Sequence, residues 1–72
     1  MLDIRGDFEL SERELRRLLA KRSRTLNRVR RMGAPRSVIE QWEWLALNTL
    51  FLWQLRKQGH DDQIAEWKRE LA

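Results

Sequence analysis

The sequence predicts an all-α protein of three helices, spanning about residues 11–32, 35–58 and 61–71. Apolar residues recur at helical spacing in each segment, and Gly33 and Gly59 stand where the first two helices are expected to end. At 72 residues the chain forms one domain, residues 1–72. A core of this size rarely supplies more than about 3–5 kcal/mol, so good helix packing or a partner subunit is needed.

The segment before the first helix is expected to be irregular. Residues 1–9 carry Leu2, Ile4 and Phe8, which we expect to fold back over the helices. The first helix then opens at Ser11, whose hydroxyl can cap the helix while Glu14 reaches back to the Ser11 amide. Cationic residues in its last turn suit the helix dipole.

The second helix is predicted to begin at or just after Pro35 and to be apolar on two faces. One face holds Trp42, Leu45, Ala46, Thr49, Leu52 and Trp53, and the other holds Trp44, Leu47, Phe51 and Leu55. A helix that is apolar nearly all round requires cover all round. We expect a homodimer packed through the second face. The alternative is that residues 1–9 and the third helix cover it.

The third helix is short, with Asp61 as its expected cap. One face of this helix is predicted to contain Ile64, Trp67, Lys68 and Leu71. The four Trp residues, at positions 42, 44, 53 and 67, are interpreted as core or interface anchors rather than base-stacking platforms.

Several functions are disfavoured by composition. The chain has no Cys and a single His, His60, so neither a disulfide nor a metal site is expected. No nucleotide-binding fingerprint or nucleophile–base pairing occurs, and we expect no enzyme activity, no cofactor and no small-molecule substrate. Without a secretory signal or a run of about twenty apolar residues, we expect a cytoplasmic protein with no membrane association.

Charge is strongly segregated along the chain. Residues 1–12 sum to −3, residues 13–36 to +9 and residues 37–72 to −2, within a net charge of +4. Glu14 is the only acid among residues 13–36. A concentrated basic surface is typical of nucleic-acid binders, because each phosphate that it neutralises releases condensed counterions.

The stretch "LSERELRRLLAKRSRTLNRVRRMG", residues 10–33, resembles the helix-turn-helix of phage-repressor-like and excisionase-like DNA-binding domains. Leu10, Ser11, Glu14, Leu15, Leu18, Leu19, Thr25, Leu26, Arg28, Val29 and Gly33 carry the resemblance. It implies that residues 24–32 form a recognition helix in the major groove, presenting Arg24, Thr25, Asn27, Arg28 and Arg31.

Two arrangements of residues 11–32 remain open. Arg22 falls in the middle of the apolar stripe, which favours a break that would let it escape. The run "LLAKRSR" contains no Gly or Pro, which favours one continuous helix from which Arg22 extends outward along its stem. The continuous helix would present a cationic outer face: Arg13, Arg16, Arg17, Lys21, Arg24, Arg28 and Arg31. With Thr25 and Asn27 of the recognition-helix arrangement, these are the predicted nucleic-acid contacts.

Two functions follow from this pattern. The first is nucleic-acid binding, with duplex DNA favoured over RNA, as a small DNA-binding regulator or accessory factor encoded by a phage or mobile element. The alternative is a protein-interaction module, an inhibitor or adaptor. It would bind an acidic protein partner through the basic helix and the Trp-rich second helix.

Overall fold

The computed structural model describes residues 3–71, and every regular element in that range is helical. A short 3₁₀ helix, η1 (Arg5–Glu9), precedes α1 (Glu12–Arg31), α2 (Arg36–Lys57) and α3 (Asp61–Leu71). The three-helix prediction is therefore confirmed, with boundaries within one or two residues of those expected. Among the described residues, no helix is long and apolar enough to cross a membrane.

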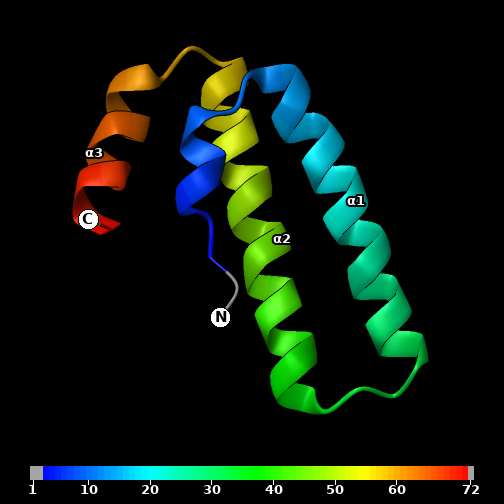
Figure 1. The fold of residues 1–72 in the computed structure, drawn as a ribbon. Helices are drawn as coiled ribbons and strands as arrows, with labels where there is room; N and C mark the ends of the chain where they lie inside the picture. The colour runs from blue at the N-terminus through cyan, green and yellow to red at the C-terminus, as the bar shows by residue number, and fades with distance from the viewer. Residues whose placement is uncertain (1–2, 72) are drawn as a thin grey trace.

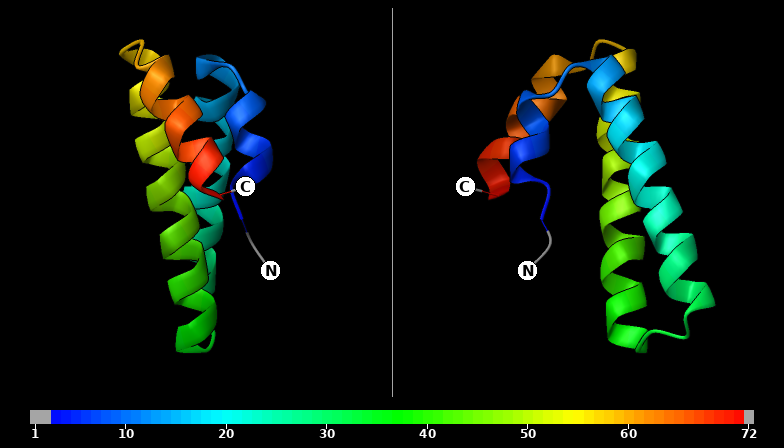
Figure 2. Two further views of the ribbon diagram at one scale, coloured as in Figure 1. Left: turned by 90° about the vertical axis from the view of Figure 1, so that its left-hand side faces the viewer. Right: turned by 45° about the vertical axis from the view of Figure 1, so that its right-hand side comes forward.

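The helices α1 and α2 form a long antiparallel hairpin (Figure 1). At the end away from the hairpin connection, the chain turns at Gln58–His60, and α3 runs back beside α2. The 3₁₀ helix η1 lies beside α3, on the same side of the hairpin (Figure 2). Because η1 and α3 reach only part of the way along α2, the part of the hairpin near the α1–α2 connection consists of those two helices alone (Figure 1).

The start of α1 has the predicted capping box. The Ser11 hydroxyl accepts the Glu14 amide at 3.2 Å, and the Glu14 carboxylate accepts the Ser11 amide at 3.1 Å. Leu15 is completely buried one turn into the helix. These bonds satisfy amides that a helix start would otherwise leave without partners.

Residues 12–31 form one uninterrupted helix. The turn that a helix-turn-helix requires near Arg22 is absent, so residues 24–32 are not a separate recognition helix. The physical reason is that Arg22 finds a partner inside the fold and needs no break to escape burial.

Both predicted glycine stops are present. Gly33 has φ of 68° and Gly59 has φ of 77°, in the left-handed region that costs a residue with a side chain free energy. Each follows the last turn of a helix, after α1 and α2 respectively.

The core lies at the end of the hairpin where η1 and α3 pack. Its buried apolar residues form one cluster: Ile4, Phe8, Leu15, Leu45, Leu52, Leu55 and Ile64. Ile4 and Phe8 cover the helices as expected, whereas Leu2 lies outside the described residues. The expectation of irregular chain before α1 was wrong for residues 5–9, which form the turn of η1. That turn brings Phe8 edge-to-face against Trp67 of α3, with ring centroids 5.2 Å apart.

The second apolar face of α2 is divided. Leu55 is buried in the core cluster, because α3 folds back over this end of α2, so its placement at an oligomer interface was wrong. Trp44, Leu47 and Phe51 remain 46%, 66% and 53% exposed. We call these three residues the apolar patch. The N-terminal segment and α3 thus cover only one end of the second face.

Candidate nucleic-acid interface

The exposed side of α1 carries seven cations that we call the basic stripe: Arg13, Arg16, Arg17, Lys21, Arg24, Arg28 and Arg31. All seven are exposed, and none lies within 4.0 Å of a carboxylate among residues 3–71. They are the cations predicted from the sequence as nucleic-acid contacts. Their charges are therefore free to meet an anionic partner.

The basic stripe faces away from the rest of the fold. At about 100° per residue, Arg13, Arg17 and Arg24 project about 160–180° from the buried Leu15 side of α1. Arg16 and Lys21 flank this line at about 100–120°. The stripe extends over roughly 27 Å between Arg13 and Arg31, at 1.5 Å per residue. It can therefore follow a run of phosphates along a duplex.

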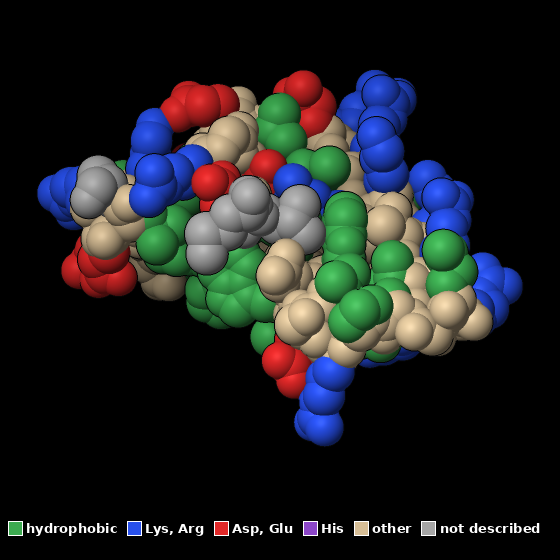
Figure 3. Space-filling model, turned by 60° about the horizontal axis from the view of Figure 1, so that its bottom comes forward, with side chains coloured by type: hydrophobic (Ala, Val, Ile, Leu, Met, Phe, Trp, Pro, Cys, Tyr) green, Lys and Arg blue, Asp and Glu red, His purple; other side chains and the backbone are tan. Residues whose placement is uncertain are grey.

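On one face of the molecule, most Lys and Arg side chains lie at the edge of the apolar surface. Seen from the side of the α1–α2 connection, hydrophobic side chains gather across the centre of the face, and Lys and Arg stand at its margin (Figure 3).

The remaining cations of residues 13–36 have partners inside the chain. Arg30 bonds Glu43 across the hairpin at 3.0 Å, and Arg36 bonds Glu40 within α2 at 3.0 Å. Arg22 turns into the fold. These cations bind carboxylates of the chain, so they do not belong to the candidate interface.

Arg22 forms a polar network that sequence reasoning missed. Its guanidinium bonds both carboxylate oxygens of Asp7 and donates to the Thr49 hydroxyl at 2.6 Å. The hydroxyl in turn donates to the Leu45 carbonyl at 2.7 Å. The side chains of Arg22 and Asp7 are only 15% and 8% exposed, and Thr49 is fully buried. The network therefore ties η1, α1 and α2 together.

The signal for this network was present but incomplete. The position of Arg22 in an apolar stripe indicated an unusual environment, yet nothing in the local sequence identified Asp7 as its partner. The two residues are 15 positions apart and meet only because η1 folds over the hairpin. Arg56 was also missed: it donates to the Phe8 carbonyl at 2.7 Å and bonds Asp61 at 3.2 Å.

Asn27 and Thr25, the two uncharged residues among the predicted nucleic-acid contacts, differ in their exposure. Asn27 is exposed on the same side of α1 as the basic stripe. Thr25 is half-buried, and its hydroxyl donates to the Lys21 carbonyl at 3.1 Å, so its proton already has an acceptor in the helix. Thr25 is therefore a poor candidate for a phosphate contact.

Glu14, the single acid of residues 13–36, forms part of the capping box at the start of α1. The bond from the Ser11 backbone amide, followed by the contact with the Ser11 side chain, lowers the pKa of Glu14. Its carboxylate sits in the first turn of α1, where the helix dipole also favours negative charge. Glu14 thus remains ionised at the start of the helix and leaves the stripe beyond it without an acid.

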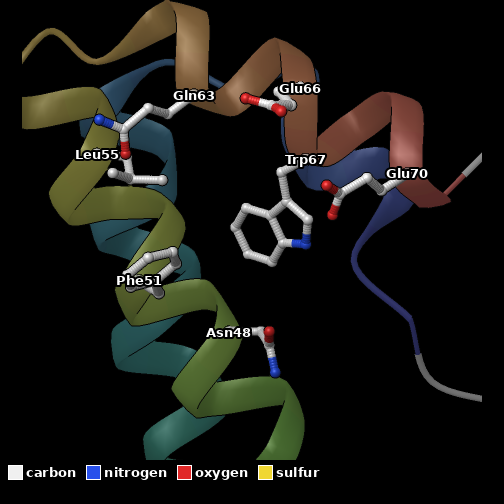
Figure 4. Close-up of a pocket in the computed structure, with 7 residues that line it drawn as sticks. All are labelled: Asn48, Phe51, Leu55, Gln63, Glu66, Trp67 and Glu70. Carbon is white, nitrogen blue, oxygen red and sulfur yellow. The ribbon is translucent and has the colours of Figure 1, made fainter.

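The opposite side of the molecule is acidic and aromatic. A groove of about 520 Å³ between α2 and α3 is lined by Asn48, Phe51, Leu55, Gln63, Glu66, Trp67 and Glu70 (Figure 4). Phe51 and Trp67 meet edge-to-face in it, with centroids 5.6 Å apart. Glu66 and Glu70 flank Trp67, so phosphates would be repelled there. This charge argues against base stacking on Trp67.

Comparison with known proteins identifies no relative: no family model, no curated protein and no solved structure matches the chain. Within the described part of the chain, no group of three or more His, Cys, Asp or Glu side chains is placed to hold a metal ion.

Proposed function

We propose that the chain is a small nucleic-acid-binding protein, a regulator or accessory factor that binds duplex DNA through the basic stripe. One observation carries the proposal. Seven exposed cations share one side of a continuous helix, and no carboxylate among the described residues pairs with any of them. In a purely structural helix, some of these cations would be expected to pair with acidic neighbours.

The expected mode of binding is contact with phosphates rather than reading of bases. A straight helix that presents Arg along about 27 Å can follow the backbone of a duplex, and Arg forks suit phosphate oxygens. Binding driven by counterion release depends weakly on base sequence and strongly on salt. The same contacts can be made to an RNA duplex, so binding to both types of duplex is part of the proposal.

We also propose that the protein is a homodimer packed through the apolar patch. The chain exposes 5424 Å², whereas a compact monomer of 8.8 kDa is expected to expose about 4,800 Å². The excess, about 600 Å², is about three-quarters of the roughly 800 Å² that each partner buries in a standard interface. Trp44, Leu47 and Phe51 carry no charge and lie on one side of α2, so they offer an uncharged surface on which an antiparallel second copy can pack.

The salt dependence of duplex binding tests the nucleic-acid proposal. If five cations of the stripe engage phosphates, the logarithm of the affinity should fall with a slope of about −4.5 against the logarithm of the salt concentration. Affinity should then drop about 500-fold between 50 and 200 mM salt. Fluorescence anisotropy with a labelled duplex of arbitrary sequence measures this directly. Absence of binding at 50 mM salt would refute the proposal and leave an acidic protein as the partner of the stripe.

A pair of charge-matched variants locates the binding surface. Arg17→Glu with Arg24→Glu removes two cations from the middle of the stripe and should reduce the salt slope by about 2. The control, Arg5→Glu with Arg69→Glu, lowers the net charge equally, from +4 to zero, but acts on η1 and α3. The control should retain most of the binding. Equal losses in the two variants would show that overall charge, not the stripe, determines affinity.

A further inference from the structure

The basic stripe and the apolar patch lie on opposite sides of the hairpin. On α2, Thr49 and Trp53 mark the side that meets α1, since they bond Arg22 at 2.6 Å and Glu12 at 3.1 Å. Trp44, Leu47 and Phe51 project about 140–160° from Thr49. Trp44 and Phe51 therefore face away from α1, just as the stripe on α1 faces away from α2. Leu47 lies at the edge of the patch nearest α1, where it lines a shallow pocket with Leu19 and Leu26.

This placement determines the layout of a homodimer built on the patch. Two copies joined through their α2 helices would stand in the order α1, α2, α2, α1, with neighbouring axes about 8–10 Å apart. The two outer helices would be about 24–30 Å apart, and their stripes would point in opposite directions. One straight duplex could not contact the centres of both stripes. Two duplexes could, one on each side.

From this geometry we propose that the homodimer bridges two nucleic-acid duplexes, holding one on each outer α1. The inference rests on the proposed nucleic-acid binding and goes beyond it by assigning a joining activity to the assembly. The partner copy is essential, because a single chain offers only one basic stripe.

Electrostatics favour a second copy of the chain as the occupant of the patch. Packing through α2 keeps the two stripes as far apart as the fold allows, so their mutual repulsion is smallest in this arrangement. The competing arrangement is head-to-tail, with the stripe of one copy against Glu66 and Glu70 of the next. Such an assembly would consume the cations that the duplexes need, and it would depend on the stripe.

A capture assay tests the bridging activity. One duplex is fixed to beads, the protein is added at low salt, and a second, fluorescent duplex of unrelated sequence is then supplied. The wild-type protein should retain the second duplex on the beads. Protein that binds the first duplex but does not capture the second would overturn the inference and leave the proposed function intact. Protein that does not bind the first duplex would refute the proposed function itself.

Leu47→Glu is the variant that separates bridging from binding. Leu47 is 66% exposed, so the substitution should leave the fold intact while placing two carboxylates face to face in the dimer. We expect its affinity for a single duplex to stay within about threefold and its capture of the second duplex to fall at least tenfold. The control is Ala65→Glu, which introduces the same charge at an exposed position of α3.

Sedimentation of the same proteins completes the test. The wild type and Ala65→Glu should sediment as dimers and Leu47→Glu as a folded monomer, with helicity checked by circular dichroism. Undiminished capture by Leu47→Glu would contradict the inference. So would a monomeric Arg17→Glu, Arg24→Glu double variant, because it would show that association uses the stripe rather than the patch.

Discussion

The two ends of the α1–α2 hairpin are built differently. At the end covered by η1 and α3, Leu15, Leu45 and Leu52 are no more than 2% exposed. Toward the connection, none of residues 16–44 is buried, and the helices meet through half-buried side chains such as Leu26 and Trp42. We call these the core end and the connection end. The comparison shows that the hairpin is stabilised mainly from one end.

The basic stripe spans both ends of the hairpin, and repulsion among its cations lowers the stability of α1. Like charges three or four residues apart on a helix destabilise it by a few tenths of a kcal/mol per pair. The pair Arg24 and Arg28 lies in the connection end, where no buried residue compensates for the repulsion. Phosphates that bind the stripe would relieve it. Nucleic-acid binding should therefore stabilise the connection end more than the core end.

Truncation of one leucine at each end should give the largest difference in stability between the two ends. Leu52→Ala removes a fully buried side chain and should cost about 2–5 kcal/mol, enough to unfold much of a domain of this size. Leu26→Ala, in the half-buried connection end, should cost less than half as much. Urea unfolding followed by circular dichroism measures both. Equal costs would show that the two ends are equally important to stability.

Breaking the Arg22 network should have the next largest effect. Asp7→Ala leaves a mostly buried guanidinium without its carboxylate and should cost about 2–3 kcal/mol, slightly less than a fully buried pair. Removing both charges, with Asp7→Leu and Arg22→Met, should restore part of that loss. Arg30→Met is the control, because it breaks an exposed pair with Glu43 that should contribute at most about 1 kcal/mol. If the double variant is no more stable than Asp7→Ala, the unpaired charge of Arg22 is not the cause of the stability lost in Asp7→Ala.

Of the changes considered, lowering the pH should have the smallest effect on the stability of the fold. The hydrogen bond and charge of Lys68 lower the pKa of Glu9, and the Ser11 amide lowers the pKa of Glu14, from an ordinary value of 4.5. Each carboxylate therefore contributes stability that is present above that value and is lost as the pH falls through the lowered pKa. The thermal midpoint should decrease from pH 5 to pH 3. In Glu14→Gln, which keeps an acceptor for the Ser11 amide but has no carboxylate to titrate, this decrease should be smaller. An unchanged pH dependence in that variant would rule out the capping box as a source.

The fold was largely predictable because its signals are local. The capping box at Ser11, the stop at Gly33 and the helical spacing of apolar residues each depend on neighbours in sequence. The exposed position of the seven stripe cations follows from the same spacing. The burial of Leu55 could not be predicted, because it depends on the direction in which α3 returns. The partner of Arg22 could not be predicted either, because the contact between Arg22 and Asp7 depends on the path of η1.

The Arg22 network also fixes the register of the hairpin. The Thr49 hydroxyl gives its one proton to Leu45, so it can only accept from Arg22, and the order of donors along the network has no alternative. Sliding α1 by one helical turn, about 5.4 Å, would bring Arg22 opposite Leu45 or Leu52 and leave its charge without an acceptor on α2. Apolar side chains alone tolerate such a slip. A single inward-facing arginine on α1 thus selects one alignment of two helices.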